Sequence, residues 1–158
     1  WVDSNKDDVR VRMVLASLYQ SSGDRPKAIE SYSQLMERLP TNVVVLNNLA
    51  WLYHEEGDSR GLGLAEKAVE IAPETPEVID TLGWILVKSG EAKRGLRYLK
   101  QAAISAPHLP SIRYHLAVAY NESGFREQAV DELQSLLGAH DAFEGRDDAV
   151  VLLRNLSS

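Results

Sequence analysis

A motif recurs along this chain every 33 or 34 residues, and that period limits the fold more than any other feature. Each copy has a leucine eight residues before a glycine, with a small residue directly after the leucine. The glycines are Gly23, Gly57, Gly90 and Gly124, and the prolines that share the period are Pro40, Pro73 and Pro107. Repeats of this length indicate an array of stacked supersecondary units, because each unit buries its apolar face only against its neighbours.

Each period reads as two helices joined by a turn at the glycine. In the second copy the apolar residues from Leu46 to Tyr53 fall at i, i+3, i+4 and i+7, which is helical spacing. The glycine suits a helix end in the left-handed conformation, and Thr75 is expected to place a capping hydroxyl before Pro76. The expected helices span 8–22, 25–39, 42–56, 59–72, 75–89, 92–106, 109–123 and 126–138.

Small residues recur in both helices of every period. Those of the first helices are Ala16, Ala50, Gly83 and Ala117, and those of the second helices are Ala28, Gly61, Gly95 and Ala129. We expect the two sets to face each other, because small side chains let paired helices approach closely.

A further helix is predicted after the last period. Apolar residues follow Phe143 between Arg146 and Leu156, with the spacing of a helix that covers the end of the array. The chain begins at Trp1 without a methionine or a signal-like segment, so we expect a piece of a longer protein. Residues 1–6 are interpreted as the remnant of an upstream repeat or a linker.

The composition excludes several classes of function. There are 17 basic and 23 acidic residues, so the net charge of −6 argues against a general nucleic-acid-binding protein. Without cysteine, disulfide scaffolds, thiolate zinc sites and cysteine nucleophiles are excluded. The longest uncharged run, from Thr41 to His54, is too short to cross a bilayer, so we expect no membrane insertion.

The period and its marks resemble the tetratricopeptide repeat (TPR) family. The first copy matches the family pattern at Leu15, Ala16, Tyr19, Gly23, Ala28, Tyr32 and Pro40. The resemblance implies an all-α, right-handed α-solenoid of four TPR helix hairpins within 7–142, at about 7–40, 41–74, 75–108 and 109–142. Residues 143–158 would then form the C-terminal capping helix.

The same resemblance implies a concave groove lined by the first helix of each hairpin. Its expected partner-binding residues are Met13, Ser17, Asn47, Trp51, His54, Asp80, Trp84, Tyr114, Val118 and Asn121, with Gln20 and Val87 at further groove positions. Trp51 and Trp84 occupy equivalent positions in adjacent repeats, so we expect them to be close in space. The alternative is that both indoles pack between helices as core.

Motifs that would indicate catalysis or a cofactor are weak. His54 and Glu55 begin like a zinc-protease helix, but the second histidine is missing. Of the carboxylate clamp known from the TPR family, only Asn48 is matched. His108, His115 and His140 lack metal-ligand spacing and are expected at the surface or partly buried. We therefore expect neither an enzyme, nor a metal site, nor a cofactor.

The function predicted from these features is a non-catalytic scaffold that binds a partner protein or peptide in the groove. A direct polysaccharide-binding module is the alternative, and a homodimer through the N-terminal face is a further possibility. Segments 46–53, 80–87 and 113–117 look like the C-terminal region of bacterial TPR lipoproteins linked to exopolysaccharide production and the PEP-CTERM sorting system. This similarity implies a periplasmic or outer-membrane-anchored protein.

Overall fold

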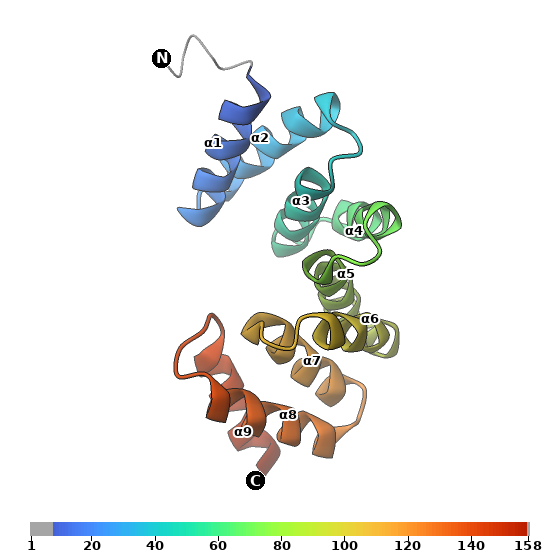
Figure 1. The fold of residues 1–158 in the computed structure, drawn as a ribbon, viewed down its shortest axis with the longest axis vertical. Helices are drawn as coiled ribbons and strands as arrows, with labels where there is room; N and C mark the ends of the chain where they lie inside the picture. Colours follow the sequence, from blue (N-terminus) through green and yellow to red (C-terminus); the bar gives the residue numbers. More distant parts are fainter. Residues whose placement is uncertain (1–7, 158) are drawn as a thin grey trace. The chain divides into compact units, whose positions relative to one another are not determined.

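A computed structural model describes residues 8–157, and within this range the chain forms helices and no strand (Figure 1). The helices are α1 Val9–Ser21, α2 Arg25–Arg38, α3 Val43–Glu55, α4 Arg60–Ile71, α5 Pro76–Lys88, α6 Ala92–Ser105, α7 Pro110–Glu122, α8 Arg126–Ala139 and α9 Arg146–Ser157. The end of each expected helix lies within one residue of the observed end, and the predicted all-α repeat fold is confirmed. The remnant predicted at residues 1–6 lies outside the described range.

The helices fall into two compact units. The first unit ends at Pro73 and contains α1 to α4, and the second begins at Glu74 and contains α5 to α9. Within each unit, consecutive helices pack as antiparallel hairpins. None of the helices in the described part of the chain has the length and apolar character needed to cross a membrane.

The turn inside each hairpin depends on its glycine. Gly23, Gly57, Gly90 and Gly124 have φ angles of 78°, 70°, 88° and 83°. At Gly23 the amide donates to the carbonyl of Gln20 at 3.1 Å, and the Asp24 amide donates to the carbonyl of Tyr19 at 2.9 Å. This left-handed ending satisfies the last carbonyls of the helix without the steric cost that a Cβ would add.

Side-chain caps differ from the prediction at Thr75. Asp24 and Asn42 cap α2 and α3 through their side chains, at 3.3 Å from the Lys27 amide and 3.1 Å from the Val45 amide. Thr75 is the N-cap residue of α5, but its hydroxyl makes no capping hydrogen bond, so that prediction is wrong. The Thr75 carbonyl instead accepts from the amides of Val78 and Ile79, each at 3.1 Å.

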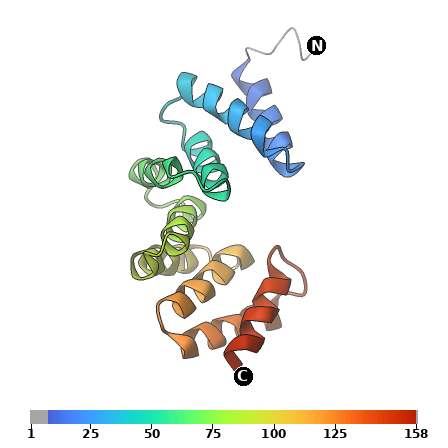
Figure 2. The ribbon, with the colours of Figure 1, turned by 180° about the vertical axis from the view of Figure 1, so that it is seen from behind.

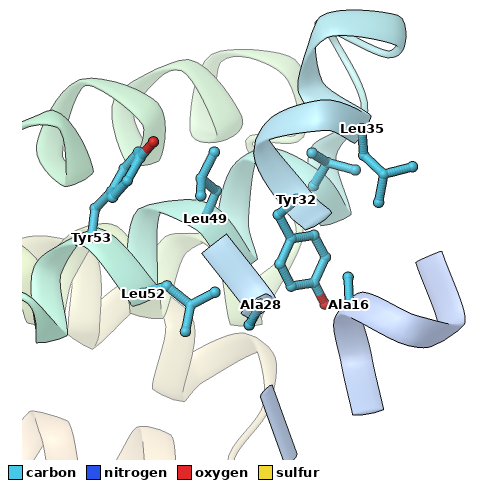
Figure 3. Packing of buried hydrophobic residues seen from close by; sticks show 8 residues of the cluster. Ala16, Ala28, Tyr32, Leu35, Leu49, Leu52 and Tyr53 are labelled. Carbon is cyan, nitrogen blue, oxygen red and sulfur yellow. The ribbon is translucent and has the colours of Figure 1, made fainter. Parts of the chain in front are cut away.

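The core of the first unit joins α1, α2 and α3 (Figure 3). Its buried members are Ala16, Ala28, Tyr32, Leu35, Val45, Leu49, Leu52 and Tyr53. The repeat leucine Leu49 and the small residues Ala16 and Ala28 thus lie in the interior, where their removal from water stabilises the hairpins, whereas Leu15 is only partly buried.

The small residues pair across the hairpins as expected. A Cβ added to Gly61 would lie 2.8 Å from the carbonyl oxygen of Ala50, and one added to Gly95 would lie 2.5 Å from that of Gly83. Backbone atoms of the facing helices therefore occupy the space that larger side chains would need.

Helix α9 covers the end of the second unit, as predicted (Figure 2). Ala149 is fully buried together with Ala117 of α7 and Leu133 of α8. Phe143 and Leu153 pack against the same cluster. The helix therefore shields apolar surface that the last hairpin would otherwise expose.

Candidate partner-binding site

Four side chains of α5 and α7 form a polar and aromatic cluster in the second unit, which we call the aromatic platform. It consists of Asp80, Trp84, Tyr114 and His115. The Trp84 and His115 rings stack, with centroids 4.1 Å apart and an interplanar angle of 23°. The Tyr114 ring lies 6.3 Å from the Trp84 ring in a tilted arrangement. Aromatic pairs at these separations gain energy beyond burial alone.

The helix period places these residues together. Asp80 and Trp84 are four residues apart on α5 and therefore share a face, while Tyr114 and His115 are neighbours on α7. The His115 Nδ1 atom lies 2.9 Å from both carboxylate oxygens of Asp80. Since a carboxylate only accepts, Nδ1–H is the donor, and this bond orients the imidazole beneath the indole.

Burial differs within the platform. Asp80 is 7% exposed and His115 is 8% exposed, whereas Trp84 and Tyr114 remain partly exposed. The Lys88 ammonium lies 5.2 Å from the centre of the Trp84 ring. The buried pair thus supports the platform from within, and the indole and the phenol are the groups that a partner could touch.

The Tyr114 ring is also bordered by the segment before α9. A Cβ added to Gly145 would lie 3.4 Å from two carbons of this ring, and Gly145 has a φ of 85°. Burial, and then the nearby carboxylate of Asp148, raise the pKa of the Tyr114 phenol above its ordinary value of 10.0.

Alkaline pH is expected to destabilise the second unit through Tyr114. The raised pKa means that the folded protein holds the phenolic proton more tightly than the unfolded chain does. This contribution is complete below pH 10.0 and is lost as the pH rises through the folded pKa. Urea unfolding at neutral and strongly alkaline pH should show that the free energy of unfolding falls at high pH. The fall should be smaller in Tyr114→Phe, and an identical fall in that variant would contradict the role of Tyr114.

Other expected groove residues of the second unit lie deeper or at the rim. Val87 and Val118 are buried at 5% and 8% exposure and belong to the core around Leu99. Asn121 is partly exposed, and its Nδ2 donates to Glu122 at 3.4 Å. Val87 and Val118 therefore offer little surface to a ligand.

Expected groove residues of the first unit lie on α1 and α3. Ser17 is exposed, and Met13, Asn47, Trp51 and His54 are partly buried. The side-chain oxygen of Asn47 is buried without a hydrogen-bond partner among the described residues. An unpaired buried acceptor is costly, so it is a natural contact for a donor on a ligand.

Two further polar residues of the first unit are tied to a buried tyrosine. The Tyr32 hydroxyl donates to Gln20 Oε1 at 3.1 Å and accepts from Asn48 Nδ2 at 2.9 Å. Asn48, the one match to the carboxylate clamp, therefore has a structural partner. The pairing predicted between Trp51 and Trp84 joins residues of different units and stays a prediction.

The role of His115 is not predicted from the sequence. The expected position of His115 is at the surface or partly buried, whereas the structure makes it a buried part of the platform. The available signal was its distance of 35 residues from Asp80, one repeat plus one residue, which places the two on facing first helices.

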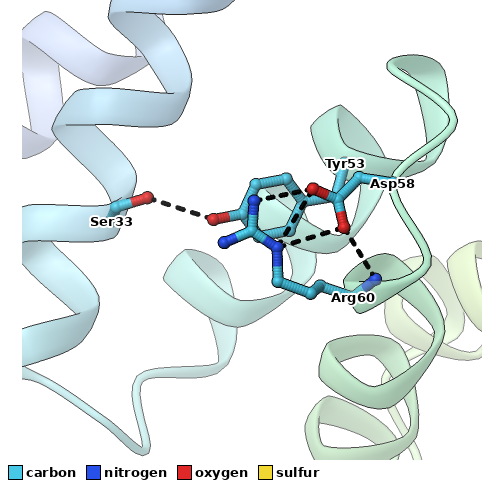
Figure 4. Close-up of polar contacts among 4 residues, drawn as sticks. All are labelled: Ser33, Tyr53, Asp58 and Arg60. Carbon is cyan, nitrogen blue, oxygen red and sulfur yellow. Dashed lines mark hydrogen bonds and ion pairs between the residues drawn. The ribbon is translucent and has the colours of Figure 1, made fainter.

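A second polar cluster holds the turn between α3 and α4 (Figure 4). The Arg60 guanidinium contacts the Asp58 carboxylate at 2.6–3.0 Å and lies 4.1 Å from the centre of the Tyr53 ring. The Tyr53 hydroxyl is 3.4 Å from Ser33 Oγ. Hydrogen bonds from Arg60 lower the pKa of Asp58. The charged groups of this cluster lie at the surface and are already paired with each other. The cluster therefore stabilises the turn rather than binding a ligand.

The platform offers aromatic and hydrogen-bonding contacts to a partner. Over residues 8–157, no three His, Asp or Glu side chains gather as the ligands of a metal ion would. The platform combines two partly exposed aromatic rings with a buried, hydrogen-bonded support.

Comparisons with known proteins agree with a TPR fold. No family model matches the chain. A TPR repeat-containing protein of Methanocaldococcus jannaschii is 34% identical over 89 residues, which are 56% of this chain and 16% of that protein. A TPR repeat-containing protein of Pseudomonas aeruginosa is 27% identical over 100 residues, which are 61% of this chain and 17% of that protein. The chain thus spans about a sixth of the length of these curated relatives.

Solved structures share the fold at low sequence identity. The type IV pilus biogenesis factor PilW has a TM-score of 0.83 at 19% identity, with 99% of this chain and 72% of PilW covered. A TPR protein of Thermus thermophilus has a TM-score of 0.78 at 20% identity, with 98% and 84% covered. An O-GlcNAc transferase of Thermobaculum terrenum has a TM-score of 0.77 at 23% identity, with 84% and 26% covered. TPR proteins generally act as protein-interaction scaffolds.

Proposed function

We propose that this chain, which has the fold of TPR proteins, is a non-catalytic scaffold that binds a segment of a partner protein on its first-helix faces. The observation that carries the proposal is the aromatic platform. Trp84 is partly exposed while the His115–Asp80 pair beneath it is buried and hydrogen-bonded. The indole is therefore held in place before any partner arrives, which lowers the entropy lost on binding.

The chemistry of the platform favours an apolar or aromatic side chain as its ligand. Tryptophan and tyrosine are enriched among the residues that dominate binding energy at protein interfaces. Their rings supply a large contact area with few rotatable bonds. We propose that one such side chain of the partner packs against Trp84 and Tyr114.

Truncation of Trp84 is expected to release the partner while the fold remains. Trp84→Ala should weaken binding by about 2 kcal/mol, roughly 30-fold, because it removes the exposed surface of the platform. The measurement is recovery of partners from bacterial envelope extract, quantified by mass spectrometry beside wild type. Circular dichroism should show an unchanged helix content.

Two control variants sharpen this test. Trp84→Phe keeps an aromatic face and should retain most of the partner. Trp51→Ala, which changes the equivalent residue of the first unit, separates a contact at the platform from one on α3. Equal recovery by Trp84→Ala and wild type would place the binding site elsewhere.

A direct polysaccharide-binding module is the second candidate, and the same two rings favour it. Trp84 and Tyr114 present neighbouring aromatic surfaces 6.3 Å apart, on which the apolar face of a sugar ring could pack. Titration with oligosaccharides, followed by indole fluorescence, distinguishes the two candidates. A saturable change that Tyr114→Ala, which keeps the Trp84 indole as reporter, abolishes would support this candidate, and the absence of any change in wild type would reject it.

For the cellular setting we propose the assembly or export of exopolysaccharide at the bacterial envelope, as part of a longer lipoprotein. The support is the resemblance of segments 46–53, 80–87 and 113–117 to TPR lipoproteins of that system. Deletion of the gene should lower exopolysaccharide yield, and re-expression should restore it. An unchanged yield would reject this setting.

We also propose that the N-terminal hairpin can pair with a second copy of the chain. Val14 and Leu18 lie one helical turn apart on α1 and are 58% and 57% exposed. Apolar residues so placed favour burial against another surface. Sedimentation over a range of concentrations should show a dimer that Val14→Glu disrupts, and a monomer at every concentration would reject it.

A further inference from the structure

Helix α6 carries a charge opposite to that of the whole chain. It holds Lys93, Arg94, Arg97 and Lys100 and no carboxylate, although the chain has 23 acidic and 17 basic residues. A local excess of one sign of charge attracts a partner of the opposite sign and speeds its association.

Three of these cations share one exposed face, which we call the basic stripe. Lys93, Arg97 and Lys100 follow the i, i+4, i+7 spacing of a helix face, and Ile104 continues it at i+11. The stripe and Ile104 extend over about 16 Å of helix. No ion pair within residues 8–157 involves these three cations, whereas Arg94 pairs with Glu91 at 3.2 Å.

An open cavity adjoins the C-terminal end of the stripe. It has a volume of about 530 Å³ and lies between α6, α7 and α8. Its apolar lining is Ala103, Ile104, Pro107, Leu116 and Tyr120. Ile104 is 82% exposed, the highest value among the large apolar residues of the described chain. The cavity therefore offers an apolar contact beside the positive charge.

The charges inside the cavity leave one cation for a ligand. Arg113 and Glu132 pair at 2.6 Å, and Arg113 also donates to Ser135 Oγ at 3.0 Å. These two groups therefore offset each other. Lys100, whose ammonium lies 5.1 Å from the Tyr120 ring, adds an uncompensated positive charge at the rim.

We propose that the basic stripe and this cavity form a second docking site, for an acidic peptide segment that carries a large apolar side chain. Carboxylates of the segment would contact the basic stripe, and the apolar side chain would enter the cavity beside Ile104 and Tyr120. A nucleic acid or a free anion would use the charge but leave the apolar lining unfilled. The site involves a helix outside the aromatic platform, so it does not depend on the function proposed there.

Selection from a random peptide-display library tests this site with the full chain. We expect the recovered peptides to combine several Asp or Glu residues with one large apolar residue. The probe is then a labelled synthetic peptide of the recovered consensus, and its affinity is measured by fluorescence anisotropy. Lys93→Glu plus Arg97→Glu should weaken binding at least about tenfold, since two attractive contacts become repulsive.

Matched variants separate docking at the stripe from general attraction. Lys67→Glu plus Arg154→Glu changes the net charge by the same amount at exposed positions outside α6 and should change the affinity less than about twofold. Ile104→Ser should lower the affinity for the peptide, because it removes an apolar contact at the cavity. Trp84→Ala should leave the affinity for the peptide unchanged. Circular dichroism of each variant checks that the helices persist.

Several results would overturn the proposal. One is a library that yields no acidic and apolar consensus, and another is equal weakening by the two charge-reversal pairs. Binding to anionic phosphatidylserine vesicles in place of the peptide would assign α6 to a membrane. Self-association of the wild-type chain that is lost in Lys93→Glu plus Arg97→Glu, but not in the control pair, would assign α6 to a second copy. Loss of peptide binding in Trp84→Ala would place the peptide on the platform instead.

Discussion

Replacement of Gly95 by alanine is expected to destabilise the second unit by about 3 kcal/mol, toward the upper end of the cost of overpacking. The added Cβ would lie 2.5 Å from the Gly83 carbonyl oxygen and 2.6 Å from Val87 Cγ2. The contact with the carbonyl involves backbone, so the α5–α6 hairpin must open for the methyl group to fit. Urea unfolding of the full chain, followed by circular dichroism, measures the change.

Gly63 provides the matched control for this substitution. It lies inside α4, and a Cβ added there would meet nothing within 4 Å. Gly63→Ala should therefore stabilise the protein by about 0.5–1 kcal/mol, because alanine restricts the unfolded chain and favours the helix. If Gly95→Ala were neutral or stabilising like Gly63→Ala, the close approach of α5 and α6 would be refuted.

Removal of the Asp80 carboxylate is expected to be the next most damaging change. Asp80→Ala should lower the free energy of unfolding by about 2 kcal/mol. The reason is that the buried His115 Nδ1–H loses its acceptor and becomes an unpaired donor away from solvent. The imidazole also loses its fixed orientation beneath Trp84. Partner binding at the platform should therefore weaken in a variant that still folds.

A double variant separates the hydrogen bond from the packing. Asp80→Leu plus His115→Leu removes both polar partners together. The double variant should lose less free energy of unfolding than the sum of the losses in Asp80→Leu alone and His115→Leu alone. The coupling free energy from this cycle reports the interaction between the two residues. Additive costs would show that the 2.9 Å contact contributes no stability of its own.

The helices could be predicted from the sequence because their determinants are local. The glycine at each turn and the i, i+3, i+4 spacing of apolar residues depend on near neighbours in the chain. Predicted and observed ends agree within one residue, from Val9 in α1 to Ala139 in α8. Thr75 shows the limit of local patterns, because its carbonyl and not its hydroxyl accepts from the amides of Val78 and Ile79 in α5.

The candidate site could be predicted only in part. Repeat alignment selected Asp80, Trp84 and Tyr114, which the structure brings together in the platform. The same alignment predicts a groove position for Val118, which is buried in the core, and it predicts none for His115. Periodicity assigns a residue to a helix face, but burial at that face depends on which side chains of the next helix fill the space.

The helical hairpins, their turns and the pairing of small residues within them can be predicted from the order of the amino acids, because these features follow from backbone conformation and spacing along one segment. The burial of Asp80 and His115 as partners and the cavity beside Ile104 arise only when the helices pack together. Both depend on contacts between residues of different helices. The free energy of such contacts arises from desolvation and packing in three dimensions, which no spacing along the chain specifies.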